Sequence, residues 1–456
     1  MRDEETGISD VDVVIVGGGL AGLTSARALV AADLSVVVLE ARDRVAGRNH
    51  GGYLNNGLPV ELGGQWIGET QEMVTGLVSD LGLETFPTYD EGEYITFYNG
   101  NAVRYGDETP GLPPETAVEV DRIWGSIETL AETVEASAPW ETPAAEDLDR
   151  VTLDAWLSDQ TDDRLALRFF RVLVPAVFAA ESPEMSLLHF LFYVKSGNGL
   201  SNLTSTTGGA QGRRVVGGTH LISERMAQQL GERVRLNTPV HTMTQDDQCV
   251  TVSFDGGEVT GQQVIVSIPP TLAGRLRYDP PLPPLRDSLT QQIPAGSVIK
   301  VQVGYETPFW REEGLSGFAL SLDHELSWVL DNSPPDSSCG VLVGFLEGGH
   351  ARKASLMTAK RRRDLVLNTL VQYFGAQAAE PFDIIELDWA AETYTRGCYG
   401  GRLGPGVWTH YGEALAQPVG RIHWAGAETS TIWNGYMEGA IRSGRRAADE
   451  ILKRQH

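Results

Sequence analysis

The first forty residues carry the pattern that most restricts how this chain can fold. Residues 11–16 form a short run rich in valine and isoleucine, and residues 34–39 form a second run of the same kind. Such runs are typical of strands buried in a parallel sheet. A glycine-rich stretch at residues 17–22 and helical spacing at residues 23–32 connect them. The sequence therefore predicts a βαβ unit and an α/β fold.

The glycine pattern lies where the first strand gives way to the helix, which is the position of a dinucleotide-binding turn. Gly17 allows the tight turn, Gly19 lets the backbone approach a pyrophosphate, and Gly22 lets the helix pack closely on the strand. Glu40, at the end of the second strand, is placed to accept hydrogen bonds from a ribose diol. The pattern predicts a dinucleotide cofactor and leaves NAD and FAD open.

Composition and missing motifs exclude several other classes of function. Of the 456 residues 61 are acidic and 36 basic, and a net charge of -25 disfavours binding to nucleic acid or anionic membranes. The three cysteines form no CxxC pair and the nine histidines no HExxH motif, so no metal site is predicted. No run of 18 apolar residues and no secretory signal is present. We therefore expect a soluble, cytoplasmic protein.

Signals typical of the nucleotide-binding part lie at both ends of the chain and in its middle. Further strands are expected at residues 234–236, 250–254, 264–268 and 424–428, and strands of a second sheet at 298–303 and 341–345. Helices are expected at residues 117–136, 163–178, 185–195, 353–373 and 436–452, and a loop at 196–212. The order of these elements predicts two domains that are interleaved along the chain.

A series of motifs resembles, in the same order, those of the flavin amine oxidase family, and among them most closely the monoamine oxidases. They are residues 40–48 (EARDRVAGR), 61–68 (ELGGQWIG), 211–218 (QGRRVVGG), 237–240 (NTPV), 268–270 (IPP), 280–283 (PPLP), 296–300 (GSVIK), Trp389, 397–399 (GCY), 424–429 (WAGAET) and 435–439 (GYMEG). The resemblance covers nearly the whole chain. It implies a Rossmann-like FAD-binding domain of the glutathione-reductase type at residues 1–87, 213–292 and 390–456. An α+β substrate-binding domain would comprise residues 88–212 and 293–389.

The resemblance also implies which residues bind FAD. Arg42 and Arg48 would bring positive charge to the pyrophosphate, Val240 would touch the adenine, and Glu428 would bond the ribityl or phosphate region. The implied cofactor-binding residues are Gly17, Gly19, Gly22, Glu40, Arg42, Arg48, Gly64, Gln65, Trp66, Val240, Trp389, Cys398, Glu428 and Met437. The chain departs from the family at Ala46, where a glycine usually stands, and the loop is expected to tolerate the methyl group.

Cys398 occupies the position where monoamine oxidases have a cysteine bonded covalently to the 8α carbon of the flavin. A thiolate that attacks this electrophilic position is reasonable chemistry. Several bacterial relatives have another residue here and bind FAD without a covalent bond. The resemblance therefore predicts FAD attached as 8α-S-cysteinyl FAD, with non-covalent binding as the alternative.

Three residues are assigned to catalysis by the resemblance. Lys300 follows an apolar stretch, and a buried lysine is costly unless its charge is used. In the family this lysine holds a water at flavin N5 and helps the reduced flavin react with oxygen. Tyr399 and Tyr436 match the two tyrosines that face each other in front of the flavin and guide the amine. The implied substrate pocket consists of Trp66, Leu203, Thr204, Gln211, Trp328 and Phe345.

The predicted activity is the oxidative deamination of a primary or simple secondary monoamine with an aromatic or alkyl tail. The amine loses a hydride equivalent from Cα, the imine hydrolyses to an aldehyde or ketone, and molecular oxygen is reduced to hydrogen peroxide. No side chain is expected to act as a general base. The family also suggests a homodimer.

Several alternatives stay open at this point. A putrescine-type oxidase of diamines or polyamines needs a carboxylate where Trp328 stands, unless a shifted register brings Asp323 or Glu325 there. A nicotine-type oxidase of cyclic amines is a further alternative. An amino-acid oxidase needs an arginine that we cannot assign. An NAD-dependent dehydrogenase and a flavin-bound scaffold without turnover are the remaining two readings, and the C-terminal motifs speak against the first.

Overall fold

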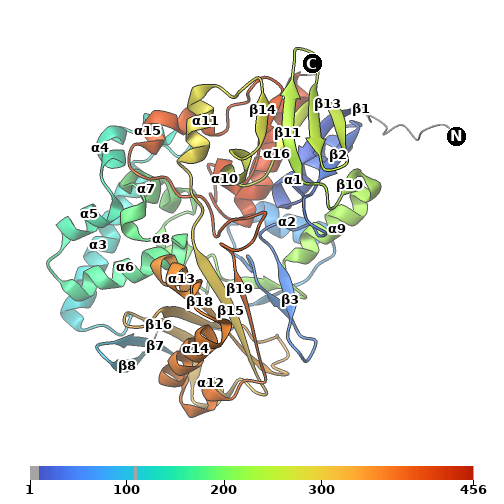
Figure 1. Cartoon of the computed structure of the whole chain (residues 1–456). Helices are drawn as coiled ribbons and strands as arrows, with labels where there is room; N and C mark the ends of the chain where they lie inside the picture. Colours follow the sequence, from blue (N-terminus) through green and yellow to red (C-terminus); the bar gives the residue numbers. More distant parts are fainter. Residues whose placement is uncertain (1–9, 107–109, 455–456) are drawn as a thin grey trace.

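The computed structural model describes residues 10–106 and 110–454, and it contains two large sheets with helices around both (Figure 1). The first sheet has eight strands in the order β10-β2-β1-β13-β12-β11-β14, and β20 also pairs with β13. These strands are β1 (Asp10–Val16), β2 (Val36–Leu39), β10 (Val234–Arg235), β11 (Val240–Gln245), β12 (Val250–Phe254), β13 (Gly257–Val266), β14 (Arg277–Asp279) and β20 (Ile422–Trp424).

The N-terminal βαβ unit lies at the centre of the first sheet. β1 pairs in parallel with both β2 and β13, and β20 pairs in parallel with β13. Val13 and Ile15 pack under the helices α1 and α16, whereas Val14 packs with buried residues of β11 and β12 on the opposite face. Because a strand alternates its side chains between two covered faces, the buried part of β1, residues 13–16, is apolar throughout. The α/β fold that the sequence predicts is therefore confirmed.

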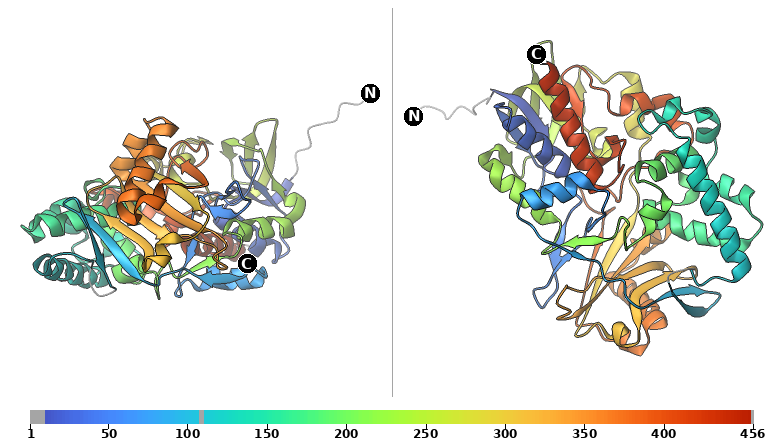
Figure 2. Two further views of the ribbon diagram at one scale, coloured as in Figure 1. Left: turned by 90° about the horizontal axis from the view of Figure 1, so that it is seen from below. Right: turned by 180° about the vertical axis from the view of Figure 1, so that it is seen from behind.

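Helices cover the face of the first sheet that is turned toward the viewer in the right panel of Figure 2. They are α1 (Leu20–Val30), α2 (Glu72–Asp80), α9 (His220–Leu230) and α16 (Met437–Arg454). A Cβ atom at Gly22 would lie 2.1 Å from the Gly17 carbonyl oxygen, so α1 can approach β1 only because residue 22 is glycine. Gly17 has a φ of +107°, a conformation that favours glycine.

The second sheet has seven strands in the order β19-β15-β18-β17-β16-β7-β8. They are β7 (Glu93–Tyr98), β8 (Asn101–Tyr105), β15 (Val298–Tyr305), β16 (Leu315–Ser321), β17 (Leu326–Asp331), β18 (Gly340–Glu347) and β19 (Asp383–Asp388). The helices α12 (Phe309–Glu312), α13 (Gly348–Ala354) and α14 (Ala359–Phe374) accompany this sheet. β15 and β18 are antiparallel neighbours buried along their whole length, and their pairing sets Lys300 opposite Phe345.

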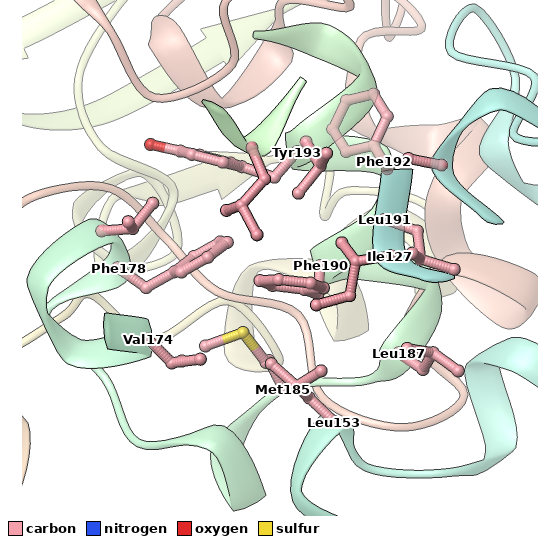
Figure 3. Packing of buried hydrophobic residues seen from close by; sticks show 14 of the residues in the cluster. Ile127, Leu153, Val174, Phe178, Met185, Leu187, Phe190, Leu191, Phe192 and Tyr193 are labelled. Carbon is pink, nitrogen blue, oxygen red and sulfur yellow. The ribbon is translucent and has the colours of Figure 1, made fainter. Parts of the chain in front are cut away.

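A group of helices forms the third part of the molecule, on the left of Figure 1. They are α3 (Pro114–Glu132), α4 (Ala145–Arg150), α5 (Leu153–Gln160), α6 (Arg164–Phe178), α7 (Leu187–Ser196), α8 (Leu200–Thr204) and α15 (Val407–Tyr411). Figure 3 shows their apolar core, in which the rings of Phe178 and Tyr193 are 4.4 Å apart. Asp163 caps α6 by accepting hydrogen bonds from the N–H groups of Leu165 and Ala166.

Several short elements complete the fold. They are the strand pair β3 (Gly51–Tyr53) and β4 (Pro59–Glu61), the small sheet of β5 (Trp66–Ile67), β6 (Thr85–Pro87) and β9 (Arg213–Val215), and the helices α10 (Pro270–Ala273) and α11 (Pro284–Gln291). The 3-10 turns are η1 (Pro139–Glu141), η2 (Ser182–Glu184), η3 (Gly231–Arg233), η4 (Ala376–Ala379), η5 (Gly412–Leu415) and η6 (Ala427–Thr429).

Three expected elements differ from the structure for local reasons. The helix expected at 353–373 is two helices, because Thr358 caps α14 by accepting from the Arg361 N–H and so starts a new helix. The loop expected at 196–212 contains α8, which buries Leu200 and Leu203 against the helical core. The strand expected at 424–428 ends at residue 424, since Gly426 has a φ of +127° and a 3-10 turn follows.

Candidate active site

A cavity of about 280 Å³ is lined by residues from both large sheets and from the helical group. A second cavity of about 290 Å³ adjoins it, and the two share Gly17, Glu40 and Arg42. The lining therefore extends from the carboxyl ends of β1 and β2 to strands β15 and β18 of the second sheet. Ligands of open α/β sheets bind at the carboxyl ends of the strands, so this position fits a dinucleotide.

The N-terminus of α1 lies at the end of the cavity that is formed by the carboxyl ends of β1 and β2. Gly19, Leu20 and Ala21 line it, no side chain caps the helix, and its first turn contains no acidic residue. A Cβ atom at Gly19 would have nothing within 4 Å, so the space in front of this turn is open. Free N–H groups and the helix dipole make such an end suitable for a phosphate group.

Glu40 is held beside this turn by the backbone. Its two carboxylate oxygens accept hydrogen bonds from the N–H groups of Gly18, at 2.7 Å, and Arg42, at 3.0 Å. The guanidinium of Arg42 donates to Thr395 and lies 3.5 Å from Glu392. Both Glu40 and Arg42 line the cavity, so a carboxylate and a cation are fixed next to the glycine turn.

Arg48 and Glu428 form a bidentate ion pair at the cavity wall, away from the glycine turn. The two guanidinium–carboxylate distances are 2.7 and 3.0 Å, and Arg48 also donates to the Tyr399 carbonyl oxygen at 2.6 Å. Burial alone would raise the pKa of Glu428, but its attraction to Arg48 and the hydrogen bonds between them lower it. Arg48 lines the cavity whereas Glu428 stands behind it, so Glu428 orients the arginine rather than facing a ligand.

Ala46 has a φ of +78° and Gly47 a φ of +50°, so the loop before Arg48 has the backbone conformation of a glycine pair. A non-glycine residue in this region costs about 1 kcal/mol or more. The N–H of Ala46 donates to the Gly18 carbonyl oxygen at 3.0 Å, which ties the loop to the glycine turn. The structure thus accommodates the methyl group that distinguishes this chain from the family pattern.

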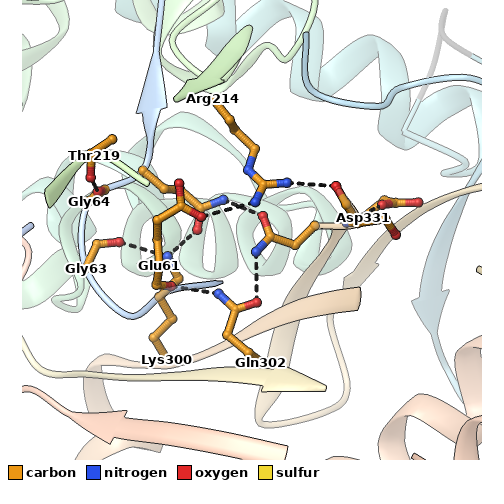
Figure 4. A network of polar contacts seen from close by, with 11 residues as sticks. Glu61, Gly63, Gly64, Arg214, Thr219, Lys300, Gln302 and Asp331 are labelled. Carbon is orange, nitrogen blue, oxygen red and sulfur yellow. Dashed lines mark hydrogen bonds and ion pairs between the residues drawn. The ribbon is translucent and has the colours of Figure 1, made fainter. Parts of the chain in front are cut away.

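Lys300 is 3% exposed and projects from β15 into the cavity lining. Its ammonium donates to the Gly63 carbonyl oxygen at 2.8 Å and to the side-chain oxygen of Gln65, as Figure 4 shows. The rings of Trp66 and Phe345 lie 5.5 and 5.6 Å from the ammonium. Burial lowers the pKa of Lys300 to about 7, although the charge of Glu61 opposes the shift.

Aromatic side chains surround the part of the cavity next to Lys300. The ring of Phe345 lies 6.1 Å from that of Trp66 and 6.4 Å from that of Tyr399. Tyr436 lines the same cavity and contacts Tyr193, with the ring centres 5.8 Å apart. Burial raises the pKa of both Tyr399 and Tyr436, so both phenols are neutral at physiological pH. The two expected tyrosines thus stand in one water-poor aromatic region.

Glu347 is a cavity residue that the sequence analysis missed. It ends β18, and one of its carboxylate oxygens accepts a hydrogen bond from the Tyr399 hydroxyl at 2.7 Å. The other oxygen, Oε2, is buried and has no hydrogen-bond partner in the described part of the chain. Burial raises the pKa of Glu347 to about 8, and the negative charge of Glu181 adds to the shift. The available signal in the sequence was a charged residue next to a long apolar run, and the same kind of signal had pointed to Lys300.

Glu347→Gln is expected to stabilise the protein at alkaline pH and to change its stability little at acidic pH. The pKa of Glu347 is raised from 4.5 to about 8, so the folded state keeps a proton that the unfolded state releases. The associated stability is complete below pH 4.5 and is lost as the pH rises through 8. Glutamine still accepts from Tyr399 but cannot ionise, so the variant should gain about 2–4 kcal/mol over the wild type between pH 5 and pH 9.

Urea unfolding of the wild type and Glu347→Gln at the two pH values measures this difference. Glu386→Gln provides a control, because Glu386 lies on β19 and its carboxylate pairs with Arg362 instead of lining the cavity. An identical stability difference at pH 5 and pH 9 would contradict the assignment of a raised pKa to Glu347.

The residues present fit an FAD molecule. The open glycine turn and the helix N-terminus suit phosphates, and two arginines line the adjoining wall. At the other end Trp66 Nε1, Gln211 Oε1 and Glu347 Oε2 are buried atoms of lining residues, and none of them has a hydrogen-bond partner among the residues that the structure describes. Unpaired buried polar atoms are rare in folded proteins and point to a ligand. An elongated cofactor with charged and aromatic parts matches this donor and acceptor set.

The structure gathers most of the predicted site residues around this cavity. Its lining includes Gly17, Gly19, Glu40, Arg42, Arg48, Gly64, Gln65, Trp66, Leu203, Thr204, Gln211, Lys300, Trp328, Phe345, Trp389, Cys398, Tyr399, Tyr436 and Met437. Val240 lines the adjoining cavity, and Gly22 and Glu428 stand behind the lining. Burial raises the pKa of Cys398 to about 12, so the thiol is neutral in this surrounding.

Residues 10–106 and 110–454 contain neither a metal-binding cluster nor a membrane-spanning helix. No group of three or more histidine, cysteine, aspartate or glutamate side chains is arranged to hold a metal ion. Within the same residues, no helix is long and apolar enough to cross a membrane.

Known proteins match this chain over nearly its full length. The family model for flavin containing amine oxidoreductases matches residues 20–452. The flavin-containing amine oxidase B of Sus scrofa is 38% identical over 453 residues, which cover 97% of this chain and 86% of that protein. A structure of putrescine oxidase bound to putrescine superposes with a TM-score of 0.95 at 36% identity, and covers 98% of this chain and 100% of its own. Cyclohexylamine oxidase from Brevibacterium oxydans IH-35A gives a TM-score of 0.94 at 33% identity, with the same coverage.

Proposed function

This chain belongs to the family of flavin-containing amine oxidoreductases and is an amine oxidase, and we propose that it acts on monoamines with an aromatic or alkyl tail. The substrate would be a primary or simple secondary amine. The products would be an imine, which hydrolyses to an aldehyde or ketone, and hydrogen peroxide from molecular oxygen.

The observation that carries the proposal is the apolar lining that α6, β16 and β17 contribute to the cavity. It consists of Leu173, Ala176, Val177, Phe318, Trp328 and Leu330. Asp323 and Glu325, the carboxylates that a shifted register would have supplied, are absent from the described lining, and Asp323 pairs with Arg168 at 2.9 Å. The six residues of this wall cannot solvate a second ammonium or a carboxylate. Glu347 also lines the cavity, but burial raises its pKa to about 8 and so keeps it protonated beside Tyr399, and the cavity therefore favours a tail without charge.

The glycine turn, the N-terminus of α1 and Arg42 would hold the phosphates of FAD, and Val240 would contact its adenine. Cys398, Trp389 and Met437 line the part of the cavity near Lys300, where the flavin ring would bind. When bound, FAD supplies the two-electron acceptor that amine oxidation requires. The covalent bond to Cys398 is part of this proposal.

The chain's own residues prepare the amine for oxidation. The faces of Tyr399 and Tyr436 attract the amine nitrogen and orient its Cα. Because the surrounding is apolar, it favours the neutral amine over the ammonium form. Phe345 and Trp66 complete the aromatic wall and exclude water. Lys300 places a positive charge where negative charge develops on oxygen as it is reduced.

A matched set of four amines tests the proposed substrate class. Peroxide release would be measured with hexylamine and 1,6-diaminohexane, and with 2-phenylethylamine and L-phenylalanine, so that each pair differs by one charged group. We expect kcat/KM to be at least about 100-fold higher for the uncharged tail of each pair, because the apolar wall leaves the extra charge unpaired.

The other outcomes separate the alternatives. Preference for 1,6-diaminohexane would replace the monoamine proposal with a putrescine-type activity, the activity of the solved structure with a TM-score of 0.95. Preference for L-phenylalanine would indicate an amino-acid substrate. Reduction of the bound flavin by an amine without peroxide release would indicate an acceptor other than oxygen.

A further inference from the structure

Three buried side-chain amides form a single hydrogen-bonded chain that ends at Lys300 (Figure 4). The Gln65 amide nitrogen donates to Asn332 Oδ1 at 2.8 Å, and the Asn332 amide nitrogen donates to Gln302 Oε1 at 2.9 Å. Gln302 in turn donates to the backbone carbonyl oxygen of Glu61 at 2.7 Å. The three amides are at most 2% exposed. They come from three segments of the chain that lie far apart in the sequence.

The two groups at the ends of this amide chain allow only one direction of hydrogen bonding. The Lys300 ammonium can only donate, and the Glu61 carbonyl oxygen can only accept. Each amide must therefore turn its oxygen toward Lys300 and its nitrogen toward Glu61. In the opposite sense, an NH2 group would face the ammonium and an oxygen would face the carbonyl. The orientation of Gln65 is thus determined by groups on the far side of Asn332 and Gln302.

We propose that Asn332 and Gln302 are positioning residues that hold the Gln65 oxygen on Lys300 and so keep its ammonium charged in the cavity. The three amide dipoles point their negative ends toward the ammonium, and in a buried site such dipoles act with little screening. The inference rests on the proposed role of Lys300 in the reaction.

The surroundings of the amide chain fix its position. The backbone N–H of Asn332 donates to the carbonyl oxygen of Val341 at 2.7 Å. Arg214 lies beside the chain, where it pairs with the Glu61 carboxylate at 3.1 Å and donates to the Ser333 carbonyl oxygen at 3.1 Å. The amides therefore link β15, the segment after β17, and the strand pair that carries Glu61.

Two charged side chains act on the charge of Lys300, each from a different segment: Glu61 on β4 raises its pKa, and Arg214 on β9 lowers it. A Cys398 thiolate would raise it too, but the proposed bond to FAD removes that charge. Together with burial they leave the pKa of Lys300 at about 7. The ammonium is therefore close to its titration midpoint at physiological pH, and a lost favourable dipole would change its protonation measurably.

The test is an NMR titration of the cofactor-containing protein with lysine labelled at 13Cε and no amine added. The chain contains five lysines, and Lys300→Met assigns the signal of interest. In the wild type the Lys300 signal should titrate near pH 7. Asn332→Leu removes the middle amide, lets Gln65 turn, and should lower this midpoint by about one pH unit.

Asn332→Asp is the opposing variant. The carboxylate still accepts from Gln65 and adds a negative charge, so the midpoint should rise by about one pH unit or more. Gln302→Leu is a second neutral variant if Asn332→Leu does not fold, and it should lower the midpoint as well. Gln71→Leu is the matched control, because Gln71 is a fully buried amide that lies outside the amide chain and whose side-chain atoms form no hydrogen bond with residues 10–106 or 110–454.

The proposal is supported if the Lys300 midpoint falls in Asn332→Leu or Gln302→Leu and rises in Asn332→Asp. In Gln71→Leu the midpoint should not move. Equal Lys300 midpoints in the wild type and the Asn332 variants would overturn it, even if the variants were less stable. Because no turnover is measured, this result does not depend on which amine the enzyme oxidises. A failure of the monoamine proposal and a failure of this inference are therefore distinguishable.

Discussion

Replacing Lys300 with methionine is expected to slow the reaction of the reduced flavin with oxygen about 100-fold, because removing one preorganised charge at a reacting group typically costs this much. Methionine preserves the length of the side chain and its contacts with Trp66 and Phe345 but removes the ammonium. Oxidation of the amine itself does not need this charge, so anaerobic reduction of the flavin by the amine should change far less. Stopped-flow absorbance measures the two half-reactions separately.

The pH dependence sharpens this prediction. Since the pKa of Lys300 is about 7, the wild-type rate of reoxidation should fall as the pH rises above 7 and the ammonium loses its proton. In Lys300→Met this dependence should disappear. Lys195→Met is the matched control, because Lys195 is paired with Glu132 at the surface. A Lys300→Met variant that reacts with oxygen as fast as the wild type would remove Lys300 from the mechanism.

Cys398→Ala is expected to convert flavin that precipitates with the protein into flavin that is released by acid. Cys398 is 4% exposed and lines the cavity, and the pKa of its thiol is raised to about 12 by burial. Arg48 lowers this pKa, so the arginine would assist formation of the thiolate when the cofactor binds. Acid precipitation followed by absorbance of the pellet and the supernatant measures the attachment directly.

Cys339→Ala is the control for this experiment. Cys339 is also buried, but it belongs to a separate cluster with Leu54, Val60 and Val341. The control should keep its flavin in the pellet. Flavin in the supernatant of the wild type would contradict the covalent bond and leave the amine oxidase family assignment unchanged. Retention of flavin by the Cys398→Ala pellet would place the bond on another residue.

Local sequence patterns predicted the glycine turn and most strands of the first sheet. The strands β11 and β14 were not expected, and the strand expected at 424–428 lies at Ile422–Trp424. The run of apolar residues in β1 and the three glycines after it are local signals that span only a few residues. In the structure Gly17 makes the turn and Gly22 allows the close packing of α1, as the glycine pattern indicated. Boundaries were less predictable where a side chain competes with the backbone. Thr358 divides the helix expected at 353–373, although the surrounding residues favour helix throughout.

Of two charged residues in the site, the sequence analysis predicted Lys300 and missed Glu347. Glu347 ends the apolar strand β18, whereas Lys300 lies within the buried strand β15, and the sequence indicated that the lysine would be buried. Only the pairing of β15 with β18 and the fold of the loop after β19 bring Glu347 onto the Tyr399 hydroxyl, 52 positions away in the sequence. The position of Glu347 at the end of an apolar run was a local signal, but its contact with Tyr399 is set by tertiary packing and could not be predicted from the sequence.

The sequence by itself determined the βαβ unit, the cofactor class that its glycines and Glu40 accept, and the order of the family motifs. The βαβ unit and the dinucleotide turn follow from backbone conformation and strand periodicity, which depend on neighbouring residues, whereas the order of the family motifs rests on resemblance. The tertiary structure alone decided which polar groups meet in the cavity: the ion pair of Arg48 and Glu428, and the amides that lead to Lys300. Buried polar groups need partners, and those partners come from whichever segments the packing of two sheets brings together.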